Sequence, residues 1–461
     1  MENVKQKLAT SYFENIPLNN VLSDYTASTA DIFDEDDSAI SPVRVTVGNR
    51  TFEYLPYGLD NMLPFKIRAE VKKNMILSQN LLFNILTCYG QGIRFFDKES
   101  GEPTDDDAIN RFYMENSLDR FFLEQATDMK THYFCVSVVI LNNAGSKILQ
   151  IRHKEACYTR FARLVGESDY NYIIYANWKD EAYPKKIEVI RLLDYINPLA
   201  DLKAHMGQAP DFMTGTMRKK WKGEKKFAIV SRFPTPGNPR YPFAYWNSVF
   251  KDTWADIYKM IGIGKAAKLR NHTSLKYHVE LHDEYMERLC DNENISDPEE
   301  RKKRIDQEYR QIRDFLTGVA NSDKLWVSNY WVDPNGKDNH MVQINQIDQK
   351  KEGGDWADDI QEASNIQCYA MNVHPNLVGA TPGKSQMNNS GSDKRELFTM
   401  KQALEKAYHD MMIIPFNVLL YFNGWYKKVK VDVPMITLTT LDENKDAEEV
   451  VNSNPKQNDG E

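Results

Sequence analysis

Apolar residues recur in steps of three and four along one long stretch near the end of the chain, 393–422. This spacing places them in a continuous stripe on one side of a helix. Asp393 with Glu396 three residues later is typical of a capping pair at the start of that helix. Pro415 lies inside the stripe, where it removes the hydrogen bond to the Met411 carbonyl and should kink the helix. The stripe consists of Leu397, Met400, Leu404, Ala407, Met411, Ile414, Val418 and Tyr421.

A loop rich in glycine, asparagine and serine, Asn376–Gly391, precedes this helix. The loop follows another helix-like run, Asp355–Met371, whose first turn carries several acidic residues. Those acids complement the helix dipole, which is a sufficient explanation for their position. Two long helices joined by a mostly uncharged loop are therefore the feature around which the rest of the chain is arranged.

The first half of the chain changes from helical to strand-like patterns. Residues 1–65 are expected to form an arm with a small amount of strand at Val43–Tyr54. Two helices are predicted next, Phe65–Thr87 and Asp105–Thr131. Runs of β-branched and aromatic residues then predict an antiparallel sheet region over 133–232.

Four prolines crowd the segment 234–242 and mark a boundary, because each fixes φ and disfavours helix before it. A helix over Ala244–Arg270 is predicted to follow. Gly262 and Gly264 lower the stability of that helix, so we expect a close neighbour packed against them. One face of the helix presents Phe250, Trp254, Ile257, Ile261 and Gly264.

A compact insertion occupies 271–350. Asp297 is a typical N-cap, and Pro298 follows it at the first helical position. The run Asp333-Pro-Asn-Gly336 is a strong turn signal for a hairpin. The predicted parts are a strand (Lys276–Leu281), a helix (Asp297 to Gly318) and two strands (Lys324–Val332 and Met341–Ile347) around the turn Asp333–Gly336.

Charge is unevenly distributed along the 461 residues, whose net charge is −8. From Asp442 the tail carries seven acidic residues against Lys445 and Lys456, a net charge of −5, so the rest of the chain is close to neutral. A neutral body argues against tight, sequence-independent DNA binding, which requires clustered positive charge.

Cysteine usage and hydropathy point to a reduced, non-membrane protein. The five cysteines are an odd number and form no C-x-x-C pair, so we expect reduced thiols with no disulfide framework and no zinc ribbon. No apolar run approaches the ~18 residues that a membrane-spanning helix needs, and the first ten residues are polar.

The central loop contains one motif that suggests phosphate chemistry, Gly383-Lys384-Ser385. A Walker A loop requires glycine where this chain has Val378, and it follows a strand, whereas a helix precedes here. A nucleotide-binding or nucleic-acid-processing enzyme that uses this loop is the alternative interpretation of the chain.

Other candidate motifs are weaker. His278 and His282 are four residues apart but lack a third ligand, and the basic run Arg218–Lys226 is more typical of a solvated loop than of a nucleic-acid site. No Gly-x-Ser-x-Gly elbow and no HExxH motif is present in the sequence. We therefore expect no metal, no cofactor and no enzymatic activity.

The order of elements resembles tailed-bacteriophage portal proteins, the head-to-tail connectors. The similarity covers about 65–435, and its specificity comes from the order of the parts because each motif is degenerate. The motifs that carry it are Pro236-Gly-Asn-Pro-Arg-Tyr-Pro242, Lys324-Leu-Trp-Val-Ser328, Ala370-Met-Asn-Val-His-Pro-Asn-Leu-Val-Gly379, Glu396-Leu-Phe398 and Pro415-Phe416.

The resemblance implies an α+β portal-type subunit with a wing of mixed helices and antiparallel sheet, a two-helix stem, a small α/β clip, a tunnel loop and a long kinked helix. Any helical crown must be small or missing, because little chain remains after Trp425. The implied parts are an N-terminal arm (1–65), wing (66–243), first stem helix (244–270), clip (271–350), second stem helix (351–375), tunnel loop (376–392), long kinked wing helix with a C-terminal strand (393–440) and an acidic tail expected to be disordered (441–461).

The resemblance also implies a function. Portals of this family are dodecameric rings at one capsid vertex, through which double-stranded DNA is packaged and ejected. The implied partners are further copies of the chain, DNA without sequence specificity, the terminase large subunit, a head–tail adaptor and the major capsid protein, with no membrane. The implied location is the virion, after assembly in the host cytoplasm. A near-neutral tube suits sliding DNA, because each neutralised phosphate adds affinity.

Three sets of site residues follow from the resemblance. The tunnel loop would offer DNA weak contacts from Lys384, Ser385, Gln386, Asn388, Asn389 and Ser390. The long helix would pack between subunits through Leu397, Met400, Leu404, Met411, Ile414 and Pro415. The stem would pack through Phe250, Trp254, Ile257, Ile261 and Gly264.

Overall fold

The computed structural model describes residues 40–436 apart from 180–183, 185, 218–223, 271–276, 318–329, 333–337, 341, 347–354 and 379–390. The chain divides into two compact units. The larger unit comprises Met1–Lys259 and Asp359–Glu461, and the smaller comprises Met260–Asp358. In the described part of the chain, no helix is both long enough and apolar enough to cross a membrane.

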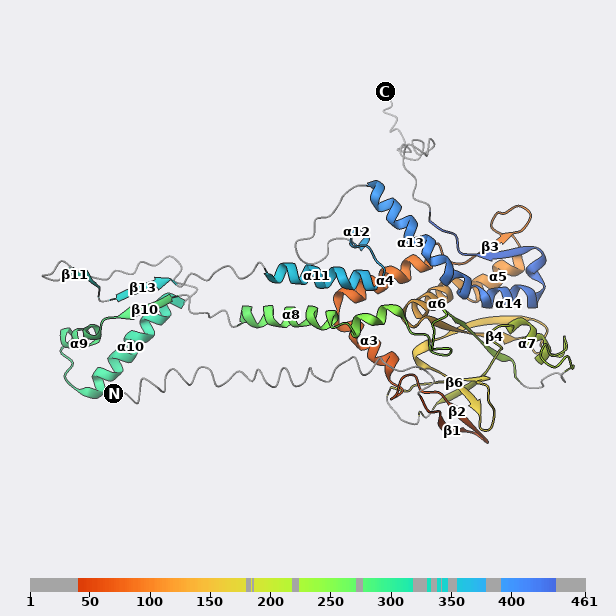
Figure 1. The fold of residues 1–461 in the computed structure, drawn as a ribbon, viewed down its shortest axis with the longest axis horizontal. Coiled ribbons are helices and arrows are strands. Elements are labelled where there is room, and N and C mark those ends of the chain that lie inside the picture. Colours follow the sequence, from red (N-terminus) through yellow and green to blue (C-terminus); the bar gives the residue numbers. More distant parts are fainter. Residues whose placement is uncertain are drawn as a thin grey trace, which may run out of the picture. The chain divides into compact units, whose positions relative to one another are not determined.

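An eight-stranded sheet forms the centre of the larger unit (Figure 1). Its strand order is β1-β2-β6-β7-β8-β9-β4-β5, and every neighbouring pair is antiparallel except β8 and β9. The predicted antiparallel region is therefore confirmed with one exception, since β8 and β9 are joined by a long connection that contains α7 (Pro198–His205). The strands are β1 (Val43–Val47), β2 (Arg50–Tyr54), β4 (Phe134–Leu141), β5 (Ile148–Lys154), β6 (Thr159–Leu164), β7 (Tyr172–Ala176), β8 (Ile187–Leu192) and β9 (Lys226–Arg232).

Side-chain amides close one edge of this sheet. Asn423 accepts a hydrogen bond from the Ile148 amide at 2.8 Å and donates one to the Ile148 carbonyl at 3.0 Å. Asn116 accepts one from the Ile151 amide at 3.1 Å. Because these bonds satisfy backbone groups that an edge strand would otherwise expose, β5 is protected from pairing with another strand.

Each of the two helices predicted before the sheet is interrupted once. The first is α3 (Leu63–Lys73) and α4 (Met75–Tyr89), separated by Asn74, whose extended backbone and side-chain carbonyl cap α4 through the Ile76 and Leu77 amides. The second is α5 (Asp107–Glu115) and α6 (Leu118–His132), separated at Ser117, whose left-handed φ of 48° cannot continue a helix.

The predicted kinked helix at the end of the chain is confirmed as α13 (Gly391–Met412) and α14 (Ile414–Asn423), with Pro415 in the first turn of α14. Phe416 of α14 is completely buried, and its ring meets those of Phe95 and Phe121 edge-on. The chain then forms β14 (Val429–Asp432), which pairs antiparallel with β3 (Arg94–Asp97). α14 is thus fixed in the main core of the larger unit.

The helix predicted over Ala244–Arg270 is wrong in its first part. A 3₁₀ turn (Tyr245–Phe250) is separated from α8 (Trp254–Arg270) by Thr253, which has a left-handed φ of 60°. Phe250 is buried beside Trp246 at the α4 side of the core and does not share a helical face with Trp254.

In its described residues, the smaller unit contains two two-stranded sheets and the helices α9 and α10, besides the adjoining ends of α8 and α11. The predicted hairpin is confirmed, because β11 (Tyr330–Val332) and β12 (Asp338–His340) pair antiparallel on either side of the predicted turn. The second predicted strand is wrong in its partner, because β13 (Val342–Gln346) pairs with β10 (Tyr277–Leu281). The sequence pattern does not predict the helix α9 (Asp283–Asn292). The helix α10 spans Pro298–Thr317.

Candidate functional site at the base of segment 379–390

Two helices lead into segment 379–390, and α13 leaves it. The predicted helix 355–371 is confirmed as α11 (Asp355–Ala370), and the short α12 (Pro375–Val378) takes the start of the predicted loop. The DNA-facing residues predicted from the sequence all lie outside the described residues, as does the Gly-Lys-Ser motif. They are Lys384, Ser385, Gln386, Asn388, Asn389 and Ser390. The described part of the site consists of the contacts made by the residues on either side of this segment.

Two hydrogen bonds join the chain before the segment to the chain after it. The Asn376 side-chain amide donates to the Asp393 carboxylate at 3.4 Å. Deeper in the protein, the Lys401 ammonium donates to the carbonyl of Asn372 at 3.2 Å. Asn372 has a left-handed φ of 52° and forms the turn between α11 and α12. Segment 379–390 thus starts and ends at positions that are connected to each other.

Helix α4 holds α11 through a row of side-chain amides. Asn80 donates to the Cys368 sulfur at 3.3 Å, and Asn84 donates to the Met371 carbonyl at 2.8 Å. Both asparagines are buried. Because buried amides need partners in fixed directions, these bonds specify one register of α11 on α4.

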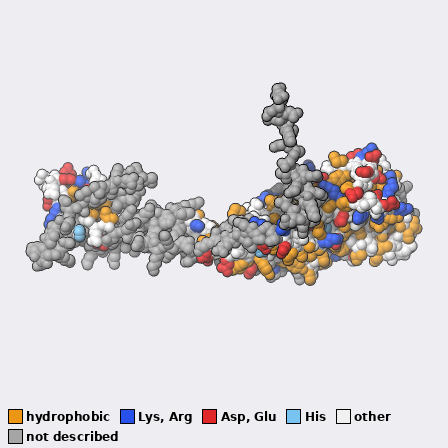
Figure 2. All heavy atoms as spheres, turned by 90° about the horizontal axis from the view of Figure 1, so that it is seen from above, with side chains coloured by type: hydrophobic (Ala, Val, Ile, Leu, Met, Phe, Trp, Pro, Cys, Tyr) orange, Lys and Arg blue, Asp and Glu red, His pale blue; other side chains and the backbone are white. Residues whose placement is uncertain are grey.

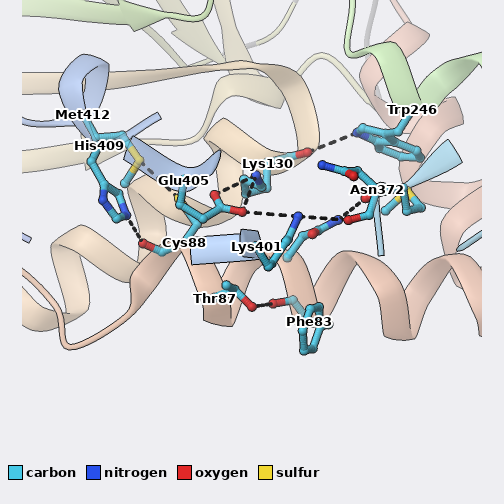
Figure 3. Close-up of polar contacts among 12 residues, drawn as sticks. Phe83, Thr87, Cys88, Lys130, Trp246, Asn372, Lys401, Glu405, His409 and Met412 are labelled. Atoms are coloured by element: carbon cyan, nitrogen blue, oxygen red, sulfur yellow. Dashed lines mark hydrogen bonds and ion pairs between the residues drawn. The ribbon is translucent and has the colours of Figure 1, made fainter. Parts of the chain in front are cut away.

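A buried ion cluster fixes α13 against α6 (Figure 3). The Lys130 ammonium lies 2.9 Å from the Glu405 carboxylate, and Lys401 lies 3.4 Å from the same carboxylate. All three side chains are almost completely buried. Lys130 also stands 3.6 Å from the centre of the Tyr408 ring, a cation–π contact.

Two ammonium groups share one carboxylate in this cluster. Burial lowers the pKa of Lys401, and the positive charge of Lys130 lowers it further, while Glu405 opposes both effects. The cluster therefore depends on Glu405, whose loss would leave two buried cations without a counter-charge.

The next turn of α13 contacts α4. His409 Nε2 donates to the Cys88 carbonyl at 2.7 Å, and the Cys88 thiol lies 3.9 Å from the Met412 sulfur. Burial lowers the pKa of His409 and raises that of the Cys88 thiol. Both groups are held neutral, so this cysteine is not an activated nucleophile. The arrangement positions α13 against α4.

The apolar stripe predicted on the long helix does not face the core in its first half. Met400 and Leu404 are 65% and 56% exposed, and Ala407 is exposed as well. The buried side of α13 carries Lys401 and Glu405 instead. The second half is mixed. Val418 is buried and Met411 and Ile414 pack partly buried against the core, whereas Tyr421 is 46% exposed. The signal that could have located the buried face is the Lys-Glu-His series at four-residue spacing, 401, 405 and 409.

The predicted stem residues on α8 are only partly buried. Trp254, Ile257, Ile261 and Gly264 each retain exposed surface. A side chain placed at Gly262 would meet no atom within 4 Å, so no close neighbour among the described residues explains that glycine.

The candidate metal ligand His282 lies in the smaller unit. His282 caps α9 by accepting a hydrogen bond from the Glu284 amide. Among the residues that the structure describes, no three potential metal ligands lie close enough to hold an ion. The predicted basic run lies mostly outside the described residues.

No family model matches this sequence, and no curated protein matches it. Solved structures do match. One is "Virion of native gene transfer agent (GTA) particle", with a TM-score of 0.52 and 10% identity over 84% of this chain and 88% of that chain. The fold is that of gene transfer agent particle chains.

Two structures of the particle's neck agree with this result. "Neck of empty GTA particle computed with C6 symmetry" matches with a TM-score of 0.51 and 10% identity, again over 84% and 88% of the two chains. "Neck of native GTA particle computed with C12 symmetry" matches with a TM-score of 0.50 and 12% identity over 83% and 87%. At the level of fold alone, these neighbours are consistent with the coarser expectation of a head–tail component of a phage-like particle.

Proposed function

We propose that this chain is a portal subunit that forms a ring at one vertex of a phage-like capsid and conducts double-stranded DNA during packaging and ejection. The observation that carries the proposal is the fold likeness, which extends over 84% of this chain and 88% of a chain from a particle neck. A match of that extent includes both units and is not limited to one common motif.

In this proposal, segment 379–390 faces the DNA. Its sequence offers hydroxyl and amide groups with Lys384 as its single charge, which suits weak, exchangeable phosphate contacts. The contacts at Asn372 and Asn376 would keep the segment at a constant position while DNA moves past it. The buried cluster around Glu405 would hold α13 behind it.

The smaller unit would be the clip, which docks the terminase large subunit and later a head–tail adaptor. The larger unit would contact the major capsid protein and the neighbouring copies. The protein would act in the virion as a structural conduit and would catalyse no reaction itself.

The mass of the purified protein in solution tests this proposal. Light scattering should give a closed oligomer near twelve times the 53.5 kDa of one chain, the symmetry named for one of the similar necks. A stable monomer at micromolar concentration, under conditions that also keep the protein folded, would overturn it.

A further inference from the structure

Two helices of the larger unit each expose a row of apolar side chains on a face that lies away from their buried polar contacts. On α4 the exposed residues Met75, Leu82 and Leu86, which we call the α4 row, are 60%, 47% and 52% exposed. On α13 the exposed residues Met400, Leu404 and Ala407 form the α13 row. On the face that Figure 2 draws, apolar side chains are exposed among charged and polar ones. Rows of large exposed apolar residues are typical of interaction surfaces.

The α4 row points away from the contact between α4 and its neighbours. Asn80, Asn84 and Cys88 make the contacts with α11 and α13. At 100° per residue these three lie on the opposite side of α4 from Leu82 and Leu86.

The α13 row also points away from this contact. Glu405 faces α6, His409 faces α4, and Lys401 faces the turn at Asn372. Met400 and Leu404 lie more than a quarter of a turn around the helix from that side, and they are exposed. The two rows are therefore separate surfaces that face outward from one packed layer of helices.

A closed ring of identical subunits requires two different contact surfaces on each copy. Each copy must present two different surfaces, one to the copy before it and one to the copy after it, because the contact is heterologous. The similar necks were solved with sixfold and twelvefold symmetry, so copies of those chains stand around an axis. A second copy of this chain is the occupant that fits two rows facing away from each other.

We infer that the α4 row of one copy packs against the α13 row of the next copy, and that this contact closes the ring. The inference rests on the proposed function, since it names the surfaces by which the proposed ring assembles. It predicts that a charge in either row blocks assembly, because an ionised carboxylate cannot be buried in an apolar contact without a partner.

Two variants test the inference, Leu82→Glu in the α4 row and Leu404→Glu in the α13 row. Each variant alone should lose the ring and remain at the 53.5 kDa of one chain by mass photometry. Thr399→Glu provides the control, because Thr399 is exposed on α13 outside the row and its variant should keep the ring. All three sites are exposed, so circular dichroism should show folded proteins.

Mixing the two variants distinguishes this contact from other possibilities. A Leu82→Glu copy keeps its α13 row, and a Leu404→Glu copy keeps its α4 row, so the mixture should form a heterodimer of twice the single-chain mass and nothing larger. A dimer from either variant alone would overturn the inference by showing that a row pairs with itself. Rings from both variants would overturn it while leaving the proposed function intact. A wild-type chain that forms no ring would overturn both.

Discussion

The Lys130 ammonium on α6 lies 2.9 Å from the Glu405 carboxylate on α13, and both side chains are buried. Lys401, one turn before Glu405, uses the same carboxylate and also reaches the turn between α11 and α12. Glu405 therefore connects α13 to α6, and its partner Lys401 connects α13 to the turn between α11 and α12.

Replacing Glu405 with glutamine should destabilise the larger unit by about 3–5 kcal/mol, because two buried cations lose their counter-charge. Denaturant unfolding followed by tryptophan fluorescence measures this change. Lys406→Ala is the matched control on the same helix, since its pair with Asp410 is exposed and should contribute less than about 1 kcal/mol. Equal, small effects from both variants would contradict the importance given to Glu405.

Replacing Asn423 with leucine should cost about 1–3 kcal/mol, because the amide and carbonyl of Ile148 lose their hydrogen-bond partner at the sheet edge. The same variant opens the edge of β5, so we expect more aggregation in light scattering at high concentration. A variant as stable and as soluble as the wild type would show that water satisfies this edge equally well.

Acidification from pH 7 to pH 5 should destabilise the protein through His132. Burial is the main cause that lowers the pKa of His132 to about 4 from 6.5, so the unfolded chain takes up its proton first. The contribution of neutral His132 to the free energy of unfolding is complete above pH 6.5 and is lost as the pH falls toward 4. The loss is about 2 kcal/mol by pH 5.

The His132→Gln variant should reduce this pH dependence. Its free energy of unfolding should change less than that of the wild type between pH 7 and pH 5, a window above the ordinary pKa values of carboxyl groups. An unchanged slope in the variant would mean that His132 is not the group responsible.

Deleting 380–390 should leave ring assembly intact and impair the packaging or retention of DNA. The reason is that the contacts at Asn372, Lys401 and Glu405 lie outside the deleted residues. DNA protected from nuclease in assembled particles measures retention, and the mass of the ring measures assembly. Loss of folding in this variant would show that the segment is structural.

Much of this fold could be predicted from the sequence, since strands β4 and β7, helix α11 and the kink at Pro415 all follow local patterns. The breaks at Asn74 and Ser117 could not, because each lies inside an uninterrupted apolar pattern and depends on one backbone conformation.

The direction of the stripe on α13 does not follow from hydrophobic periodicity alone. Periodicity shows which residues share a face, but it does not show whether that face meets the same chain or another copy. Here the buried contacts of the first half of α13 are made by charged residues, and the apolar residues are exposed. On α4, buried asparagines likewise make specific contacts, although apolar residues are buried beside them.

An image of the purified assembly along its symmetry axis tests the central claim most directly. The account predicts a closed ring of identical subunits around an open channel wide enough for double-stranded DNA. Single chains, open filaments, or a closed particle without a central channel would contradict it.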